Sequence, residues 1–327
     1  DARRVSGSRW DAILAAAGRE PLPSATIERF RIFAMLNLGF IGLGAMGRPM
    51  ALNLLNAGYR LHVHARGAVR AEPLVAAGAN LAESPVAVAR AVEILFVNVS
   101  DDAAVQAVLF GQDGAAAGMR PGGVVVDMGT TSPAATREFA ARVADAGVAW
   151  LDAPVSGGEA GAEAGTLSIM AGGDEAVFAR VLPLFQVLGK NIVHVGATGA
   201  GQVVKACNQI AVSATLLGVA EALTFARKQG VDPERARAAL LGGSAYSRIL
   251  EVHGQRMLTR EFTPGFRARL HQKDLGIVLD EAREKHVGLP GAAVAAQLLN
   301  ALVAAGEGEL DSSALVKVVE RLAGFES

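Results

Sequence analysis

The sequence predicts an α/β fold with a doubly wound parallel sheet, followed by an all-α C-terminal domain. From Met35 to Gly196, short apolar runs typical of buried strands alternate with segments of helical spacing. Such alternation indicates a parallel sheet covered by helices. After Gly199 every segment has helical spacing, and the chain length of 327 residues suits about two domains.

We therefore expect three regions along the chain. Residues 1–34 form an arginine-rich N-terminal extension that we expect to be poorly ordered, residues 35–198 the α/β domain and residues 199–327 the helical domain. The extension has a short apolar patch at 12–17 without a small-residue cleavage site after it, and it contains acidic residues. These features argue against a signal or transit peptide, so we expect a cytoplasmic protein whose functional part begins near Met35.

Composition narrows the classes of function. The formal net charge is -1 and no basic block stands out, which argues against nucleic acid or an anionic membrane surface as a partner. Hydrophobic residues make up 51% of the chain, enough to build buried cores. Because Cys207 is the only cysteine, an internal disulfide and a cysteine-ligated zinc site are excluded, and a reducing compartment fits.

The α/β domain is expected to contain seven strand-like runs, most of them continuously apolar as buried parallel strands are. They lie at 36–44, 59–66, 92–99, 122–129, 148–157, 166–173 and 190–196. Segments of helical spacing separate them, at 45–58, 71–79, 101–111, 132–147 and 174–189. In the fourth of these helices, Ser132 is expected as N-cap and Pro133 at the first position, where proline's missing N–H costs nothing.

The C-terminal domain is expected to contain six helices. They lie at 201–229, 232–242, 247–259, 269–285, 291–305 and 312–322. Pro233 and Pro290 stand where helices begin, and Gly230, Gly288 and Gly306 stand where helices end.

The helix at 201–229 is apolar over most of its circumference and approaches the length of a membrane span. Polar residues interrupt it, so we expect a buried helix that joins the two domains instead. Lys205 and Asn208 are three positions apart and therefore share one helix face. Because burying an unpaired ammonium costs several kcal/mol, we expect that face to serve function and not core packing.

The segment GFIGLGAMG has the spacing G-x-G-x-x-G at the end of an expected strand and the start of an expected helix. In that context the pattern indicates a Rossmann-type dinucleotide site. Gly42 allows a tight turn, Gly44 lets the pyrophosphate approach, and Gly47 lets the helix pack on the strand, with the phosphates at the helix N-terminus. The expected cofactor-binding residues of this loop are Gly42, Leu43, Gly44, Ala45, Met46 and Gly47.

The end of the second strand indicates which dinucleotide is bound. NAD sites commonly have an acid there, about 20 residues after the glycines, for the ribose 2′-hydroxyl. Residues 61–70 contain no acid but do contain Arg66 and Arg70, and arginine pairs well with a 2′-phosphate. We expect NADP(H) to be favoured, with Arg66 at the phosphate. NAD(H), with Arg66 as a solvated loop charge, stays possible.

Four segments together resemble the β-hydroxyacid dehydrogenase family: GFIGLGAMGRPMALNLL, DAPVSGGEAGAEAGTLSIMAGG, GAGQVVKACNQ and HQKDLGIVLDEA. They stand in the family's order, and the resemblance extends from Met35 to about Gly324. It implies an NAD(P)-dependent enzyme that associates through its helical domain as a homodimer or homotetramer. Within the family, GTLSIMAGGDEAVF, FTPGFRARLHQKDL and GEGELDSSAL are most similar to the tartronate semialdehyde reductase branch.

By this resemblance Lys205 matches the family's catalytic lysine, and Asn208 its neighbour on the same face. When an aldehyde is reduced its oxygen takes up a proton, which a lysine can donate if its pKa is drawn toward the working pH. Burial and the positive end of a helix dipole both lower a lysine pKa, and Lys205 lies near its helix start. The Asn208 amide can donate and accept hydrogen bonds, and so can orient the lysine or the substrate.

The resemblance implies the remaining site residues as well. Ser156, Gly157 and Gly158 match the substrate-binding loop, where a hydroxyl and close backbone N–H groups can meet a carboxylate; an ordinary turn is the alternative. Thr130 and Lys273 match positions at the nicotinamide, and Lys273 is also expected at the substrate. An ion pair with Asp274 or Asp280 on a solvated helix face is the alternative for Lys273.

We therefore expect an NADPH-preferring reductase of a small semialdehyde acid, with Lys205 as general acid. Tartronate semialdehyde (2-hydroxy-3-oxopropanoate) and D-glycerate are the leading substrate and product, so the partner is a small anionic hydroxy or oxo acid. The alternatives are 3-hydroxyisobutyrate dehydrogenase or a related β-hydroxyacid dehydrogenase, and a non-catalytic nucleotide-binding scaffold.

Two other residue types attract attention but are assigned no chemistry. His62 and His64 have the spacing of metal ligands on one strand, but no third ligand is apparent, and we expect no metal. Cys207 lies in an apolar helix, where we expect it to be inert packing.

Overall fold

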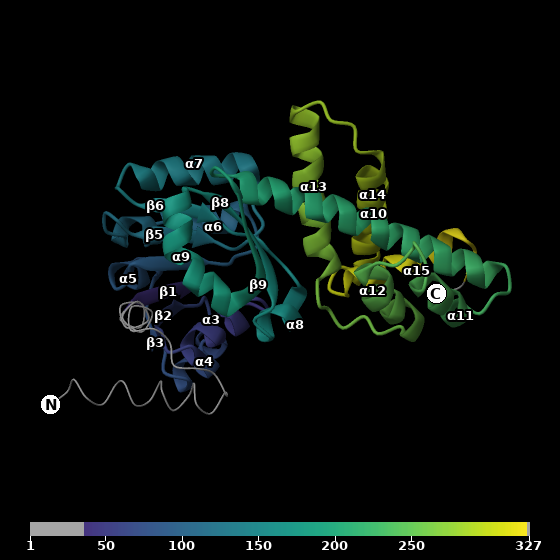
Figure 1. The fold of residues 1–327 in the computed structure, drawn as a ribbon, viewed down its shortest axis with the longest axis horizontal. Helices are drawn as coiled ribbons and strands as arrows, with labels where there is room; N and C mark the ends of the chain where they lie inside the picture. The colour runs from purple at the N-terminus through teal and green to yellow at the C-terminus, as the bar shows by residue number, and fades with distance from the viewer. Residues whose placement is uncertain (1–35, 326–327) are drawn as a thin grey trace.

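The computed structural model describes residues 36–325, so the expectation for residues 1–34 lies outside the described residues. An α/β part and a helical part lie side by side and are joined by one long helix, α10 (Ala200–Lys228) (Figure 1). This order confirms the fold class predicted from the sequence.

The α/β part is built on a nine-stranded sheet. Its strands are β1 (Asn37–Ile41), β2 (Arg60–His64), β3 (Asn80–Leu81), β4 (Ile94–Val97), β5 (Val124–Asp127), β6 (Ala149–Asp152), β7 (Val155–Ser156), β8 (Leu167–Gly173) and β9 (Gly189–Gly196). The strand order is β3-β2-β1-β4-β5-β6-β8-β7, and β9 pairs with β8. From β3 to β6 all pairs are parallel, which places the carboxyl ends of these strands along one edge.

The expectation of a parallel sheet throughout was wrong at its far end. Strand β8 runs antiparallel to both β6 and β7, and β9 then runs parallel to β8. The link from β7 to β8 contains only the six-residue helix α8 (Gly158–Glu163), which is shorter than the crossover that a parallel return requires.

Seven helices pack around the sheet. They are α3 (Gly47–Asn56), α4 (Glu72–Ala76), α5 (Pro85–Arg90), α6 (Asp102–Phe110), α7 (Pro133–Ala144), α8 and α9 (Glu175–Leu188). The predicted cap of α7 is confirmed, because the Ser132 hydroxyl accepts a hydrogen bond from the Ala135 N–H and Pro133 is the first helical residue. Three short elements, β3, α5 and α8, were not predicted from the sequence; each has six residues or fewer. Helix α5 had a usable signal, since Ser84 caps it and Pro85 begins it.

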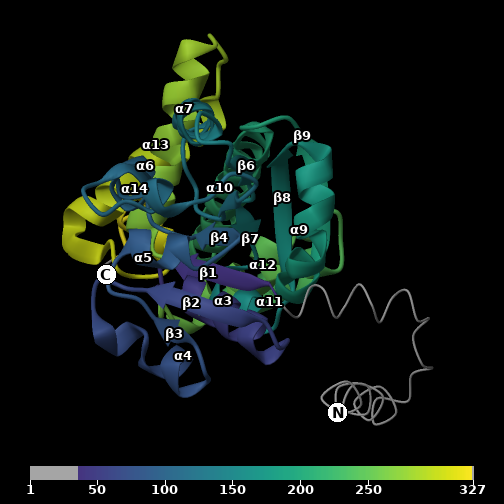
Figure 2. The same cartoon turned by 90° about the vertical axis from the view of Figure 1, so that its left-hand side faces the viewer.

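Two apolar cores cover the two faces of the sheet, as the alternation of side chains along β4 illustrates. Ile94 and Phe96 point into the core beneath α3 and α9. Leu95 and Val97 point into the core beneath α5, α6 and α7. Figure 2 shows α5 and α9 on opposite sides of the sheet. Each fully buried side chain of this size contributes about 1.5–3 kcal/mol to the stability of the fold. The two cores together therefore stabilise the sheet from both of its faces.

The helical part follows without a further strand in the described residues. After α10 it contains α11 (Pro233–Leu241), α12 (Arg248–Thr259), α13 (Ala268–Glu284), α14 (Pro290–Leu302) and α15 (Leu315–Leu322). Helix α14 continues into a π-helical turn at Val303–Glu307, which Gly306 ends with a φ of 81°. The last predicted helix begins with a 3₁₀ turn at Ser312–Ala314.

Helix α10 contacts both parts of the molecule. It packs on β6, β8, β9 and α7 of the α/β part and on helices α11 to α15 of the helical part. Among the described residues it is the one helix long and apolar enough to cross a membrane, and 44% of its most apolar window is buried inside the structure. The face that carries Lys205 is buried and polar near the start of the helix; its buried residues are Gln202, Lys205, Gln209 and Ser213.

Candidate active site

The candidate site lies where the carboxyl edge of the parallel strands meets α10 and α13. Ligands of doubly wound α/β proteins bind at this edge of the sheet. The loops that follow β1, β2, β4 and β5 come from the α/β part, and Lys205 on α10 and Lys273 on α13 come from the helical part.

The glycine loop after β1 has the shape that a dinucleotide requires. A Cβ atom on Gly42 would lie 2.1 Å from the Asn98 carbonyl oxygen, and one on Gly47 would lie 1.8 Å from the Gly42 oxygen. Gly44, in contrast, faces open space, with no atom within 4 Å of such a Cβ. Helix α3 begins without a side-chain cap and without an acid in its first turn, so its N–H groups can meet phosphate oxygens. These residues fit the pyrophosphate of a nicotinamide dinucleotide.

Arg66 lies in the exposed loop after β2, apart from the lysines but along the same edge. Burial raises the pKa of Asp101 at the start of α6, yet hydrogen bonds from Ser100 and the Ala104 N–H and the positive charges of Lys273 and Arg66 bring it below its ordinary value. The Asp101 carboxylate thus interacts electrostatically with both Arg66 and Lys273.

Lys205 is buried, with 7% of its surface exposed. Its Nζ donates a hydrogen bond to the Val155 carbonyl oxygen at 2.9 Å, directly before Ser156. Burial lowers the pKa of Lys205, the Asp274 carboxylate raises it, and the Lys273 ammonium lowers it again. The net direction is downward, which is the direction that a proton donor at neutral pH needs.

Asp274 connects the polar residues of α10 to those of α13. Its Oδ1 lies 2.8 Å from Lys273 Nζ, and its Oδ2 accepts a hydrogen bond from Gln209 Nε2 at 2.6 Å. Lys273 also donates to the Thr130 carbonyl oxygen at 2.7 Å. Lys273 therefore lies beside Thr130, as predicted. It also forms an ion pair, but with a buried aspartate and not on a solvated helix face.

Asn208 is half-buried and donates to Gln209 Oε1 at 2.8 Å. Gln209 itself is buried and follows Lys205 by four positions, which is the stronger same-face spacing. Gln209 was not predicted from the sequence, whereas Asp274 was considered only as an alternative ion-pair partner of Lys273, a pair that the structure contains. The i, i+4 spacing from Lys205 could have indicated Gln209, but its Asp274 partner lies 65 positions further along the chain and no local pattern indicates this pairing.

The 156–158 loop links β7 to α8 and lies directly after the Lys205 contact. Gly157 has a φ of 137° and Gly158 a φ of 65°, values that favour glycine over any other residue. A Cβ on Gly158 would lie 3.5 Å from the Gly265 oxygen in the link between α12 and α13. The loop therefore approaches the helical part at Gly158, while Gly157 is exposed.

Two buried carboxylates, at the ends of β5 and β6, bind backbone groups next to the candidate site. Asp152, at the end of β6, accepts hydrogen bonds from the N–H groups of Gly199 at 2.7 Å and Gln202 at 3.0 Å, and so caps α10. Burial raises the pKa of Asp152 against these bonds. Burial likewise raises the pKa of Asp127, at the end of β5, to about 7. The start of α10 is thus fixed to the strand ends.

A buried histidine lies behind Lys205. His271 on α13 is fully buried, and its Nε2 lies 2.7 Å from the Ser213 hydroxyl on α10. Burial lowers the pKa of His271 to about 4, against the charge of Asp274. His271 is therefore neutral at pH 7 and stabilises the contact of α10 with α13.

The other residues considered from the sequence do not join this site. His64 Nδ1 lies 3.1 Å from the Ala82 oxygen on the far strands of the sheet, and residues 36–325 contain no group of three or more potential metal ligands. Cys207 is exposed, so its expected packing role was wrong: it points outward from α10 on the side opposite to Lys205.

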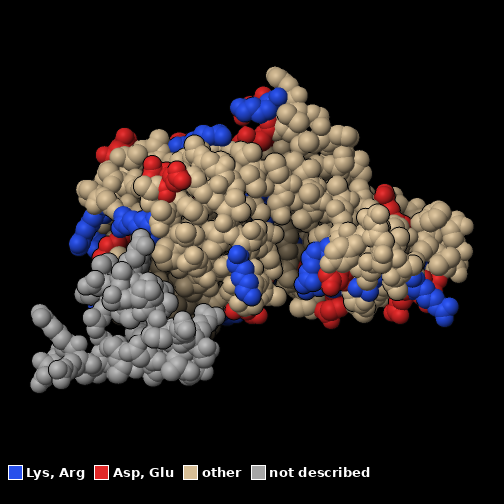
Figure 3. All heavy atoms as spheres, in the orientation of Figure 1, with Lys and Arg blue, Asp and Glu red and all other residues tan. Residues whose placement is uncertain are grey.

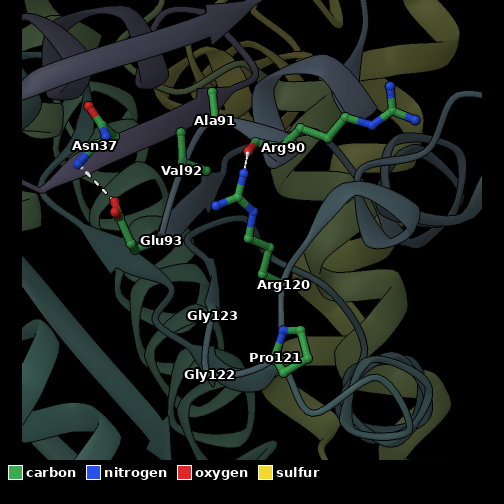
Figure 4. Close-up of a pocket in the computed structure, with 9 residues that line it drawn as sticks. All are labelled: Asn37, Arg90, Ala91, Val92, Glu93, Arg120, Pro121, Gly122 and Gly123. Carbon is green, nitrogen blue, oxygen red and sulfur yellow. Dashed lines mark hydrogen bonds between the residues drawn. The ribbon is translucent and has the colours of Figure 1, made fainter.

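A separate polar pocket of about 350 Å³ lies at the opposite edge of the sheet (Figure 4). Two of its polar side chains bind the backbone: Arg120 donates to the Arg90 oxygen, and Glu93 accepts from the Asn37 N–H. The strands enter the sheet here, so this pocket is remote from the lysines.

Comparison with known proteins identifies the family. Residues 37–196 match the NAD binding domain of 6-phosphogluconate dehydrogenase, and residues 199–319 match the family described as NAD-binding of NADP-dependent 3-hydroxyisobutyrate dehydrogenase. A 2-hydroxy-3-oxopropionate reductase of Escherichia coli (strain K12) is 51% identical over 291 residues, which cover 89% of this chain and 99% of that protein.

Solved structures agree with the sequence matches. The crystal structure of 3-hydroxyisobutyrate dehydrogenase from Salmonella typhimurium has a TM-score of 0.79 at 32% identity and covers 86% of this chain and 99% of its own. Psf3 in complex with NADP+ and 2-OPP has a TM-score of 0.79 at 29% identity, with coverages of 86% and 99%. The chain, with its glycine loop, buried lysine and helical second half, therefore belongs to the β-hydroxyacid dehydrogenase family of NAD(P)-dependent oxidoreductases.

Proposed function

We propose that the protein is an NADPH-preferring reductase of a small semialdehyde acid, and that it converts tartronate semialdehyde to D-glycerate. The observation that carries this proposal is Lys205, a buried ammonium bonded to the residue before the 156–158 loop. The 51% identity to a 2-hydroxy-3-oxopropionate reductase supports the choice of substrate.

In this proposal residues 35–198 bind the cofactor, and residues 199–327 supply the catalytic lysine and the subunit contacts. The 42–47 loop and the start of α3 hold the pyrophosphate, Thr130 and Lys273 border the nicotinamide, and Arg66 pairs with the 2′-phosphate. NADP(H) supplies the hydride when bound. The NADP+ complex of Psf3 supports a cofactor of this class.

The chain's own groups perform the proton transfer. Ser156 and the glycine N–H groups after it bind the substrate carboxylate, because glycine lets the anion approach the backbone closely. Lys205 donates its proton to the aldehyde oxygen as that oxygen becomes the hydroxyl of the product. The lowered pKa of Lys205 reduces the cost of giving up this proton. Asn208 and Gln209 orient the lysine and the substrate oxygen.

Initial rates on a panel of substrates test this proposal. The panel contains tartronate semialdehyde, methylmalonate semialdehyde, D-glycerate, 3-hydroxyisobutyrate and serine, each with both cofactors. We expect the highest kcat/KM for tartronate semialdehyde with NADPH. A higher kcat/KM for oxidation of 3-hydroxyisobutyrate would establish the alternative, for which the likeness to the Salmonella typhimurium dehydrogenase is the supporting observation. A protein that binds NADPH but turns over no member would be a nucleotide-binding scaffold.

We also propose a cytoplasmic homodimer or homotetramer that associates through the helical part. One side of α10 is left exposed along the whole helix and is mostly apolar; it comprises Val203, Cys207, Ala211, Ala214, Gly218, Ala222 and Phe225. Phe225 is 66% exposed, and an exposed apolar stripe of this length favours contact with another subunit. The face in Figure 3 carries acidic and basic residues in small mixed groups, with wide uncharged areas between them.

A further inference from the structure

The 129–131 loop after β5 is held by one side chain of the neighbouring helix. Gln202, in the first turn of α10, is 2% exposed. Its Oε1 accepts a hydrogen bond from the Thr131 N–H at 3.2 Å, and its Nε2 donates to the Gly129 oxygen at 2.9 Å. A single amide thus binds the backbone on both sides of Thr130.

Asp127 and Lys273 also bind this loop. Asp127 accepts from the Gly129 N–H and from the Thr131 hydroxyl, each at 3.0 Å. Lys273 binds the Thr130 oxygen. Of these partners only Gln202 lies on the helix of the catalytic lysine, three positions before Lys205 and on the same face. The backbone N–H of Gln202 is in turn fixed by Asp152.

We propose that Gln202 is a positioning residue that sets the distance between the 129–131 loop and Lys205. The proposal rests on the function proposed above, in which Thr130 borders the nicotinamide and Lys205 protonates the substrate oxygen. Hydride and proton reach one carbonyl group from these two sides, so the separation of loop and lysine decides whether both arrive in a reactive geometry. A displacement of about 1 Å is enough to cost roughly 100-fold in rate.

Glutamine suits this role because the loop presents a donor and an acceptor together. Methionine at 202 has a similar length but makes neither bond. An ionised glutamate accepts from Thr131 but repels the Gly129 oxygen, whereas a protonated glutamate donates to Gly129 and restores both bonds. Both Gln202→Met and Gln202→Glu keep a side chain of similar length. An effect of these variants therefore reports the loss of the paired hydrogen bonds and not a loss of side-chain volume.

The first measurement is amide hydrogen exchange of the ligand-free protein, followed by mass spectrometry of peptides that cover residues 129–131. We expect Gln202→Met to exchange these amides about tenfold faster or more, since a local opening no longer breaks two buried bonds. Gln112→Met, in an exposed loop after α6, is the matched control and should leave them unchanged. Unchanged exchange in folded Gln202→Met would overturn the proposal.

The second measurement is turnover. For Gln202→Met we expect kcat to fall about 10- to 100-fold, the NADPH Kd to stay within about threefold, and the kinetic isotope effect with deuterated NADPH to increase. For Gln202→Glu, the ratio of its kcat to that of the parent should rise as pH falls, because burial raises a glutamate pKa. If this ratio of kcat values does not change with pH, the hydrogen-bond role of Gln202 is refuted. This test with Gln202→Glu remains decisive even if Gln202→Met does not fold. If Gln202→Met speeds amide exchange in the 129–131 loop but the parent protein does not reduce the semialdehyde, the positioning role of Gln202 is retained. Only the proposed substrate is then rejected.

Discussion

Lys205 is a buried ammonium whose neighbours carry charges of both signs. Asp274 opposes the lowering of its pKa, and burial with Lys273 favours it. A bound substrate carboxylate adds a further negative charge, so the lysine is expected to hold its proton until the substrate oxygen requires it. If Lys205 is the proton donor that we propose, the balance between these groups, and not the lysine alone, sets the pH at which the enzyme works.

Replacing this lysine tests its role directly. We expect Lys205→Met to lower kcat by roughly 10²- to 10⁴-fold, the range of general acid catalysis, while NADPH binding followed by fluorescence stays within about threefold. Lys205→Arg should be nearly as slow, because a guanidinium does not release its proton near neutral pH. Turnover close to that of the parent in Lys205→Met would remove the lysine from the mechanism.

Arg66 determines the choice of cofactor in our proposal. Arg66→Ala should raise the KM for NADPH about tenfold, as expected for loss of one charged hydrogen bond, and leave the KM for NADH unchanged. Arg235→Ala, on the exposed side of α11, serves as the control. Equal effects on the two cofactors would show that Arg66 does not contact the 2′-phosphate.

His271 makes stability depend on pH in the acid range. Its pKa is lowered from 6.5 to about 4 in the folded chain, so the unfolded chain binds the proton first. The stabilisation is fully present above pH 6.5 and is lost as pH falls toward about 4, by at most about 1.4 kcal/mol per pH unit. Urea unfolding across this range should give a flatter profile for His271→Gln than for the parent. Parallel profiles would contradict the buried neutral state.

The 156–158 loop depends on backbone geometry that only glycine adopts freely. Alanine at 157 would have to take a φ of 137° and would place its Cβ 3.1 Å from Leu167. We expect Gly157→Ala to raise the substrate KM at least tenfold, with little change in cofactor binding, because the carboxylate would lose its close approach to the backbone. Gly276→Ala, in the open middle of α13, should keep the parent's KM and stabilise the protein by up to about 1 kcal/mol.

The elements differ in how far the sequence could predict them. Segments with local signals were predicted well, such as the glycine turn at Gly42 and the cap at Ser132. The antiparallel direction of β8 was not, because strand direction depends on how the whole chain folds back and not on the side-chain pattern of the strand. In the site, Lys205 stood out as a charge in an apolar helix, and the sequence offered Asp274 as an ion-pair partner of Lys273. The hydrogen bond from Gln209 to Asp274 could not be predicted, because it forms only when α13 packs on α10.

At the scale of the whole molecule, the exposed face of α10 predicts a subunit contact. Phe225→Glu places a charge on the apolar stripe, and we expect it to reduce the molecular mass measured by light scattering, toward that of a single chain, because burying an unpaired charge costs several kcal/mol. Val69→Glu, at a 74% exposed site in the α/β part, should leave the mass unchanged. A parent protein that is already monomeric would reject the proposed association.

The contact between α10 and α13 also has a consequence for synthesis on the ribosome. The cofactor loop and Lys205 are translated first, whereas Asp274 and His271 follow only after three further helices have begun. A growing chain that ends before α13 can therefore complete its dinucleotide fold, since domains generally fold as units, yet it exposes a polar helix face without partners. In our proposal, catalytic competence therefore requires that α13 has emerged and packed on α10.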